Sequence, residues 1–534
     1  MTVESTADGA AETVWRPTYN PWLIAVVVAL AAFMEVLDGS IANVALPYMA
    51  GSMAASNDES TWVLTSYLVS NAIVLPMSGW LAVTFGRKRF FMGCLAIFTL
   101  SSLLCGVAPS LATLLLFRVV QGAGGGGLQP MAQAILADSF PPQQRGLAFA
   151  LYGVTTIIAP TVGPTLGGWI TFNYSWRWIF FINLPVGMVA LGLILRLVED
   201  PPYLSRLKAA GVRMDYIGVA LLTVGVGALQ ILLDKGQEDD WFGSRFMTTL
   251  AVMAIVCLVT LVVWEWFQKT PMIDVRLFKH FNYLSANVMM FVLGALLFSS
   301  LVLMPQFLQT QLGYTAQLAG LVLSGGAVVL LLAMPVVGQL TTKVQARYMI
   351  AFGWLCLAAA MYYSTMRIDL VISFSSATWL RIAQSIGLGF LFVPMSLVAY
   401  VGIPAEKTNA VAGMINFMRN MGSSVGTSVM TTVIARRSQF HETMLVGHAS
   451  SGNQTFLNAV NGLTGRLTSF GISLPDAQRL AYGRIYRIIQ AQAATLAYID
   501  VFSILAVCAS VMFFSSFLLA KNDPRAGGAG VAVG

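Results

Sequence analysis

Charged residues are scarce in this chain of 534 residues: Asp, Glu, Lys and Arg make up 10% of it, against 57% hydrophobic residues. Soluble domains carry about 25% charged residues, so this composition excludes a water-soluble globular protein. Long apolar runs recur from end to end, and about 20 apolar residues suffice for a helix to cross a bilayer. The sequence therefore predicts an all-α polytopic membrane protein.

Cysteine and histidine are also sparse. The five cysteines stand singly in apolar runs and the three histidines form no metal-ligand pattern, so no metal site is predicted. The phosphate-binding motif G-x-x-x-x-G-K-[ST] is absent, which argues against an ATP-driven pump. The basic residues behind the net charge of +7 lie scattered between apolar runs. This pattern indicates membrane topology and predicts no nucleic-acid partner.

About fourteen segments are long and apolar enough to span a bilayer. They cover residues 22–45, 60–82, 90–108, 112–137, 147–170, 178–198, 215–234, 246–267, 284–309, 316–340, 347–366, 376–401, 408–435 and 499–520. The first is too long and too acidic for a cleaved signal peptide. Lys and Arg concentrate in alternate short loops, which predicts that both termini are cytoplasmic.

An internal repeat relates the two halves of the chain. Arg118-x-x-Gln121 in the fourth span recurs as Arg381-x-x-Gln384 in the twelfth, and the basic loop at 79–89 recurs at 338–347 at nearly the same separation. The shift of eight spans predicts two six-helix bundles with two inserted helices, an arrangement of transporters. The expected units are a cytoplasmic tail (1–20), an N-terminal bundle (21–200), the insertion (201–270), a C-terminal bundle (271–520) with an extracytoplasmic loop (436–498), and a disordered tail (521–534).

Two carboxylates, Glu35 and Asp38, stand in the first apolar run. A charged side chain at the bilayer centre costs about 2.5–3.5 kcal/mol on insertion scales, and such residues usually have a function. The spacing of three places both on one side of a helix. They are candidate proton-coupling groups, Asp38 ahead of Glu35. Alternatively, Asp38 only anchors one helix to another, and Glu35 matches the charge of a cationic substrate.

The fourth span reads LLLFRVVQGAGGGGLQP and places Arg118 inside an apolar segment. An arginine there needs a partner or an aqueous cavity, unless it snorkels to the interface. We expect it to be the partner of Asp38. Gln121 and Gln129 follow on the same helical face, and the glycines favour close helix packing.

Two glycine-containing motifs are candidate gating elements. The basic turn GWLAVTFGRKR (79–89) forms either a latch or only a topology signal. The fifth span contains APTVGPTLGGW (159–169), whose small residues and prolines form either a hinge between the halves or a packing face. The candidate gating residues are Gly79, Arg87, Arg89, Gly163, Pro164, Gly167 and Gly168.

A polar stripe runs along the thirteenth span, with asparagines and an arginine every three or four positions. Such a stripe either lines a cavity or forms hydrogen bonds across helices, and we favour the cavity. The candidate substrate-cavity residues are Gln121, Gln129, Arg381, Gln384, Asn416, Arg419 and Asn420.

The connection after the thirteenth span is too long for a simple link. It begins polar and rich in Gly, Ser and Asn, and it ends in a predicted helix that starts near Ser473 and Pro475 and runs into the last span. This region is either a docking surface, a lid or a solvated loop without a partner.

These motifs, taken in order, resemble a known family. LDGSIANVALP, GWLAVTFGRKR, LLLFRVVQGAGGG and APTVGPTLGGW are similar to the first-span signature and to motifs A, B and C of drug:proton antiporters. The chain resembles the fourteen-span antiporters of the major facilitator superfamily, the EmrB/QacA type, and among these the EmrB subgroup. Two positions depart from the pattern: Val83 replaces the usual Asp of motif A, and Ala159 replaces the first Gly of motif C.

The resemblance implies a secondary active transporter rather than an enzyme, with a proton gradient in place of a cofactor. It implies proton-coupled efflux of drug-like amphiphiles by alternating access across the bacterial inner membrane. Asp38, Glu35 and Arg118 would couple protons, and a periplasmic adaptor and an outer-membrane channel would be partners besides the lipid bilayer. The alternatives are a transporter of one metabolite, such as a fatty acid, an aromatic acid or a nutrient, and, less favoured, a membrane scaffold.

Overall fold

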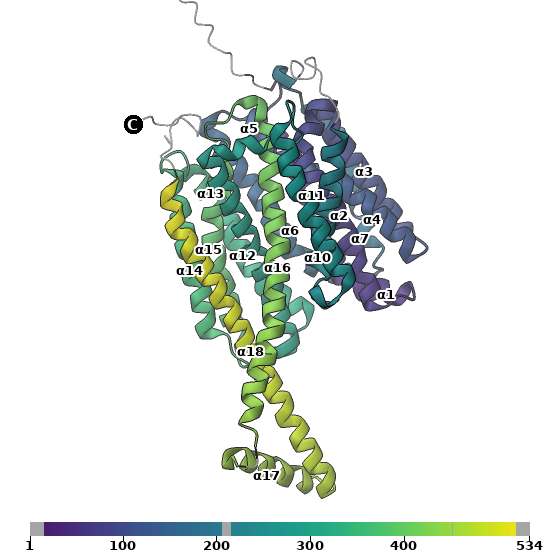
Figure 1. The fold of residues 1–534 in the computed structure, drawn as a ribbon, viewed down its shortest axis with the longest axis vertical. Coiled ribbons are helices and arrows are strands. Elements are labelled where there is room, and N and C mark those ends of the chain that lie inside the picture. Colours follow the sequence, from purple (N-terminus) through teal and green to yellow (C-terminus); the bar gives the residue numbers. More distant parts are fainter. Residues whose placement is uncertain (1–14, 16, 205–214, 451, 520–534) are drawn as a thin grey trace, which may run out of the picture.

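The computed structural model describes residues 15, 17–204, 215–450 and 452–519. In these ranges the chain is built from helices and has no strands. The expected tail at 521–534, and most of that at 1–20, lie outside the described residues. The described ends of the chain lie at one end of a bundle of long helices (Figure 1), which we call the termini face.

The first bundle is formed by α1 (Pro21–Ser52), α2 (Asn57–Phe85), α3 (Arg87–Val107), α4 (Leu111–Gly125), α5 (Leu128–Ser139), α6 (Pro142–Asn173), α7 (Trp178–Phe181) and α8 (Asn183–Leu197). Local sequence sets their starts. Asn20 caps α1 by accepting a hydrogen bond from Trp22 N, with Pro21 in the first turn. Ser56 and Glu59 form a capping box at the start of α2.

The expected fourth span is confirmed as one candidate span, Leu111–Ser139, with a two-residue turn inside it. We predicted one helix over 112–137, whereas α4 ends at Gly125 and α5 begins at Leu128. The glycine run explains both the break and the tight packing. A β-carbon on Gly122 would lie 2.3 Å from the carbonyl oxygen of Tyr67 on α2, and one on Gly127 would lie 2.4 Å from Cys94 Sγ on α3. Only glycine allows such close helix approach.

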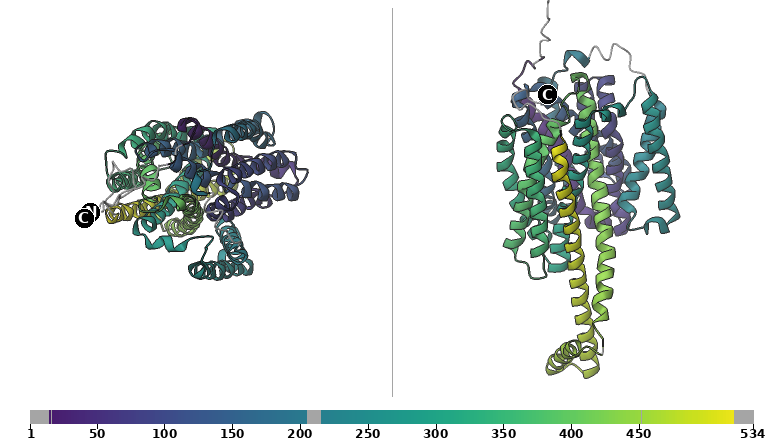
Figure 2. Two further views of the ribbon diagram at one scale, coloured as in Figure 1. Left: turned by 90° about the horizontal axis from the view of Figure 1, so that it is seen from above. Right: turned by 60° about the vertical axis from the view of Figure 1, so that its left-hand side comes forward.

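Two helices, α10 (Tyr216–Lys235) and α11 (Arg245–Phe267), form a pair on the outside of the bundle (Figure 2). They pack on one another, and α10 also contacts α2. They occupy the segment for which we predicted an insertion of two helices. Part of that segment, 205–214, lies outside the described residues.

The remaining helices are α12 (Phe281–Leu312), α13 (Ala316–Leu340), α14 (Ala346–Arg367), α15 (Phe374–Val398), α16 (Thr408–Gly447), α17 (Gln454–Ser469) and α18 (Leu474–Ser515). Within the described residues, 13 helices are long and apolar enough to cross a membrane. The helix on the expected thirteenth span, α16, runs beside them through the bundle (Figure 1) but is more polar. Together these helices give the polytopic all-α architecture predicted from the composition.

The expected loop at 436–498 is largely helical, including its polar first part, for which no helix was predicted. The helix α16 continues past residue 435 to Gly447, α17 follows, and α18 runs unbroken from Leu474 into the last span. Figure 1 shows α16 and α18 leaving the bundle side by side, with α17 across their tip. We call residues 436–498 the stalk. Asp500 ties its two long helices together by accepting hydrogen bonds from Arg437 Nε at 2.6 Å and His441 Nε2 at 2.7 Å.

The two bundles meet closely near the termini face. A β-carbon on Gly79 of α2 would lie 2.8 Å from Ala410 Cα of α16. One on Gly146 of α6 would lie 2.5 Å from the carbonyl oxygen of Gly338 on α13. Such backbone-to-backbone contacts leave no room for a solvent path between these helices at this end.

Candidate functional site

Asp38 lies at the centre of a buried polar cluster inside the first bundle. Arg118 of α4 donates to its Oδ2 at 2.7 Å, while Gln121 of α4 and Asn183 of α8 donate to its Oδ1 at 3.0 and 2.7 Å. Asp38 is 2% exposed and Arg118 is fully buried. Arg118 is thus paired inside the bundle rather than extended to the interface.

Arg118 is held in place from several sides. Its Nε donates to the carbonyl oxygen of Val63 at 3.0 Å, and its guanidinium lies 4.2 Å from the centre of the Tyr67 ring. Arg118 also donates a hydrogen bond to Gln121 Oε1 at 2.8 Å, because the i, i+3 spacing puts the two side chains on one helical face. One guanidinium nitrogen, Nη2, is buried and has no hydrogen-bond partner among the described residues. The ion pair is therefore rigidly positioned, with one donor unused.

Glu35 occupies a separate buried cluster one helical turn away. Its carboxylate accepts hydrogen bonds from Tyr67 Oη and Asn71 Nδ2 of α2, each at 3.0 Å, and from Gln129 Nε2 of α5. All three partners are donors, so the cluster suits the ionised carboxylate. Glu35 is 4% exposed.

The Glu35 cluster continues into the second bundle. Gln129 Oε1 accepts a hydrogen bond from Arg419 of α16, and Tyr152 of α6 lies 3.4 Å from the same oxygen. Asn416, one turn before Arg419, donates to Gln133 Oε1 of α5 at 2.6 Å. The polar stripe predicted on the thirteenth span therefore forms hydrogen bonds across the bundles in this structure, the alternative that we favoured less.

Arg381 and Gln384 form another cluster, within the second bundle. Arg381 donates to Gln384 Oε1 at 3.1 Å and to Ser300 Oγ of α12 at 3.2 Å, and Gln384 donates to Ser364 of α14. This repeats the Arg118–Gln121 geometry with a serine in place of the carboxylate. Asn420 is half-buried beside Arg419, with no side-chain hydrogen bond in the described part of the chain.

The candidate gating residues fall into two places. Arg87 is fully buried and pairs with Asp138 of α5 at 2.6 Å, whereas Arg89 is exposed. Tyr203 also donates to Asp138 at 2.7 Å. Burial, together with this carboxylate, raises the pKa of the Tyr203 hydroxyl, which therefore stays a donor. An ion pair thus joins the basic turn to α5, although Val83 stands where motif A usually has an acid.

The small-residue face of α6 packs against α1 of its own bundle. A β-carbon on Gly163 would lie 2.4 Å from Ser40 Oγ, and one on Gly167 would lie 3.0 Å from Ile41, while Gly168 has more room. Pro164 lies in the continuous helix α6. The face of α6 towards the second bundle is a different one, since Gly153 approaches Phe392 of α15.

Several residues of these clusters were not among the candidates. Each lies in a mainly apolar helix, and its partner depends on how the helices are rotated against one another. The omitted partners are Tyr67, Asn71, Gln133, Asp138, Tyr152 and Asn183. Asp138 alone carries a detectable signal, an acid at the end of the fourth span opposite the basic turn.

Comparison with known proteins fits this arrangement. The family model described as "Major Facilitator Superfamily" matches residues 28–427. The multidrug export protein EmrB of Haemophilus influenzae is 37% identical over 86% of this chain and 88% of its own length. The probable multidrug resistance protein EmrY of Escherichia coli is 38% identical over 82% and 84%. The fatty acid resistance protein FarB of Neisseria gonorrhoeae is 37% identical over 85% and 87%.

A solved structure gives the same fold. The proton:xylose symporter XylE aligns with a TM-score of 0.60 at 14% identity, covering 96% of this chain and 97% of the symporter. The helical architecture, the matched family model and the relatives agree. The chain is a member of the major facilitator superfamily, similar to its EmrB-type multidrug transporters.

Proposed function

We propose that this protein exports amphipathic, drug-like compounds across the inner membrane in exchange for protons, by alternating access of its two bundles. The observation that carries the proposal is the pair of buried carboxylate clusters on α1. One holds an ion pair within the first bundle, and the other reaches the second bundle through Gln129 and Arg419. A scaffold would not need ionisable groups so placed.

The Glu35 cluster offers a physical link between a proton and the bundle contact. Protonation removes the negative charge from a carboxylate that accepts three hydrogen bonds, and it therefore weakens these charge-assisted bonds. Loss of the Gln129 bond frees the amide that also accepts from Arg419. Protonation of Glu35 would thereby loosen the contact between α5 and α16.

Asp38 is the second proposed proton site. In the ionised form it compensates the charge of the fully buried Arg118. Protonation of Asp38 would remove its negative charge and leave the buried Arg118 guanidinium without a counter-ion. This change would favour a different helix arrangement. In the proposed cycle, Asp38 loses its proton when the site faces the cytoplasm and regains one when it faces outwards.

The substrate class is proposed from the surroundings of the polar clusters and from the relatives. The interface between the bundles is mainly apolar with a few polar groups, such as Gln129, Asn416 and Arg419, which suits varied amphiphiles. The relatives are described as multidrug export and fatty acid resistance proteins. Transport of one specific metabolite is the alternative that a substrate screen would reveal.

The stalk is the proposed docking surface for a periplasmic adaptor, which would join an outer-membrane channel. We place both termini in the cytoplasm, from the loop charges, so the stalk extends into the periplasm. From Ala491 to Leu474, α18 runs for about 26 Å. Along it Tyr482 and Tyr486 are exposed. Exposed aromatic side chains on a rigid hairpin are typical of protein contact surfaces.

Exchange can be tested in everted vesicles loaded with a proton gradient. Addition of a substrate should dissipate the gradient in the wild type and not in Asp38→Asn, while the exposed Asp239→Asn serves as a control of equal charge change. Normal exchange by Asp38→Asn would refute its coupling role. If no amphiphile dissipates the gradient in the wild type, proton-coupled export itself is refuted.

Adaptor docking needs a separate test. Replacing residues 440–490 by a short Gly/Ser linker should abolish efflux from cells that contain the adaptor, and it should leave exchange in liposomes intact. Efflux from cells at the wild-type rate would contradict docking on the stalk. Loss of exchange in liposomes would show instead that the stalk serves transport directly.

A further inference from the structure

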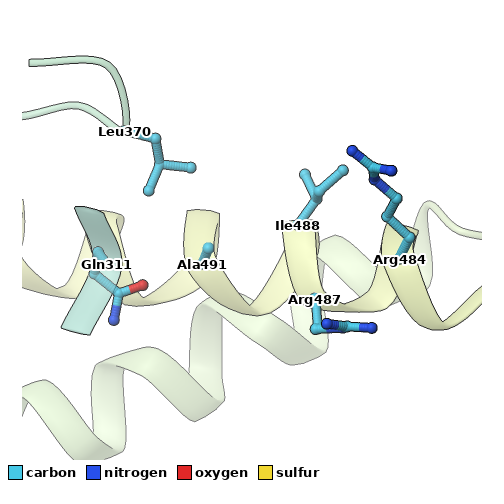
Figure 3. Close-up of a pocket in the computed structure, with 6 residues that line it drawn as sticks. All are labelled: Gln311, Leu370, Arg484, Arg487, Ile488 and Ala491. Atoms are coloured by element: carbon cyan, nitrogen blue, oxygen red, sulfur yellow. The ribbon is translucent and has the colours of Figure 1, made fainter. Parts of the chain in front are cut away.

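A groove opens where the stalk leaves the bundle. It has a volume of about 510 Å³ and lies between α18, the end of α12 and the connection that follows α14. Figure 3 shows Arg484, Arg487 and Ile488 along α18, with Leu370 opposite them. The groove therefore combines two cationic side chains with an apolar wall. Its lining residues are Gln311, Leu370, Arg484, Arg487, Ile488 and Ala491.

Neither arginine of the groove is neutralised by the protein. Both are exposed, and among the described residues neither forms an ion pair or a hydrogen bond. Other arginines of the stalk region do have partners, since Arg437 binds Asp500 and Arg479 lies 3.8 Å from Asp476. Asp369 is the residue just before Leu370, but its carboxylate accepts a hydrogen bond from the backbone N–H of Val371. The groove thus carries two free positive charges.

The position of the groove relative to a bilayer follows from the helix ends. Gln311 is the second-last residue of α12, and Leu370 follows the end of α14, so both mark the outer rim of the spanning bundle. Along α18, Arg487 and Arg484 lie about 6 and 10 Å beyond Ala491. A bilayer has about 30 Å of hydrocarbon and about 40–45 Å in total, which leaves a head-group layer of several ångströms on each side. The backbone positions of the two arginines therefore lie just beyond the rim of the bundle, from which their long side chains can reach the head groups.

The rim beside the groove has the character of a membrane interface. Trp379 near the start of α15 is 66% exposed, and Val371, in the same connection as Leu370, is 86% exposed. Aromatic side chains concentrate at the boundary between hydrocarbon and head groups. An exposed apolar residue as large as Val371 is favourable there when lipid covers it.

From this geometry we propose that the groove binds an anionic phospholipid of the leaflet opposite the termini face. The phosphate group lies between Arg484 and Arg487, and the start of the acyl chains lies against Leu370, Ile488 and Ala491. Guanidinium groups suit a phosphate because their planar array of N–H donors matches its oxygens. The bound lipid bridges α18 to the rim of the bundle and so fixes the base of the stalk. The site does not depend on which compound is exported.

The test measures lipid binding to the full-length protein in detergent by native mass spectrometry. Phosphatidylglycerol is titrated against the wild type, against Arg484→Gln/Arg487→Gln, and against Arg466→Gln/Arg479→Gln, which removes the same charge elsewhere on the stalk. We expect the tightest phosphatidylglycerol to bind about 30-fold more weakly to the groove variant, the effect of two interfacial arginines. The stalk control should match the wild type.

Two further arms make the result decisive. Phosphatidylcholine, which has the same chains without net charge, should bind alike to all three proteins, and unchanged thermal unfolding without lipid would show that the groove variant is folded. Equal phosphatidylglycerol affinity of the groove variant and the wild type would overturn the proposal. Displacement of the lipid by millimolar inorganic phosphate would also overturn it, because the site would then be one for free phosphate.

Discussion

At the scale of single residues, Arg118 and Arg381 occupy corresponding places in the two bundles, but their partners differ in charge. Each donates to a glutamine three positions later on its own helix. Arg118 also meets Asp38, whereas Arg381 meets the hydroxyl of Ser300. In the part of the chain that the structure describes, Arg381 thus is a buried cation that forms no ion pair, at a position where burial of a charge is costly.

Replacement of each arginine by methionine should therefore have different effects. Arg118→Met leaves Asp38 buried without its cation and should lower stability by about 3–5 kcal/mol. Arg381→Met removes a buried cation that has no carboxylate partner and should leave stability unchanged or higher. Unfolding in detergent would measure both, and Asp38→Asn should restore part of the loss in Arg118→Met. Equal losses in the two variants would contradict this account.

Gly122 provides a second prediction at residue scale. A β-carbon there would lie 2.3 Å from the backbone oxygen of Tyr67, which cannot move without shifting α2. Gly122→Ala should therefore destabilise the protein by about 1–3 kcal/mol. Gly93→Ala on α3 is the control, because no atom lies within 4 Å of its added methyl group and alanine favours a helix by about 1 kcal/mol. Unfolding temperatures of the two variants should move in opposite directions.

At the scale of elements, α6 shows how a helix with an internal proline is completed by its neighbour. Pro164 has no N–H, so the carbonyl oxygen of Pro160 lacks its partner in the helix. Ser40 of α1 donates to that oxygen at 3.0 Å. Gly163 lets the two helices come this close. The proline-rich face of α6 is thereby joined to the helix that carries Glu35 and Asp38.

A double-mutant cycle would test this dependence. Ser40→Ala leaves the half-buried carbonyl oxygen of Pro160 without this donor and should cost about 0.5–1.5 kcal/mol. In a Pro164→Ala background the helix supplies its own N–H, so Ser40→Ala should cost clearly less. The coupling energy is read from unfolding of the four proteins. If Ser40→Ala costs the same in both backgrounds, the hydrogen bond does not compensate for the proline.

The elements themselves were largely predictable, because spans depend on local composition. Long apolar runs located the spanning helices, and the start of α18 at Ser473 and Pro475 was read from capping chemistry. The stalk half of α16 was missed because its few apolar residues, such as Phe440 and Met444, are mixed with polar ones, and its helix is stabilised by packing on α18. The break between α4 and α5 was missed because glycine runs fit both a packed helix and a turn.

The site was less predictable, because its contacts depend on the rotation of helices against each other. The Asp38–Arg118 pair was anticipated, since two opposite charges in apolar spans each need a partner. Nothing local indicated that Asn183 would join Asp38 or that Gln129 would face Glu35. Arg419 was expected in a cavity, and its bond to Gln129 depends on how the two bundles dock.

At the scale of the whole molecule, side-chain hydrogen bonds and small residues both hold the two bundles together towards the termini face. Near the termini face, Gly79 and Gly146 allow backbone contact between the bundles. Farther in, Arg419 bonds to Gln129 and Asn416 bonds to Gln133. A hydrogen bond contributes about 0.5–1.5 kcal/mol, and one to a charged group about 1.5–3 kcal/mol. A few such bonds are sufficient to set which of two arrangements is populated.

Removal of these bonds should therefore shift the molecule towards an arrangement open at the termini face. Spin labels at Arg89→Cys and Lys343→Cys, both exposed, report the separation of the bundles once the five native cysteines are replaced. We expect Asn416→Ala/Arg419→Ala to add or enrich a longer distance, because loss of about 2 kcal/mol changes the ratio of two states about 30-fold. Asn420→Ala, a neighbour without side-chain hydrogen bonds in the described residues, should leave the distribution unchanged. Identical distributions in all three proteins would mean that backbone packing alone holds this end closed.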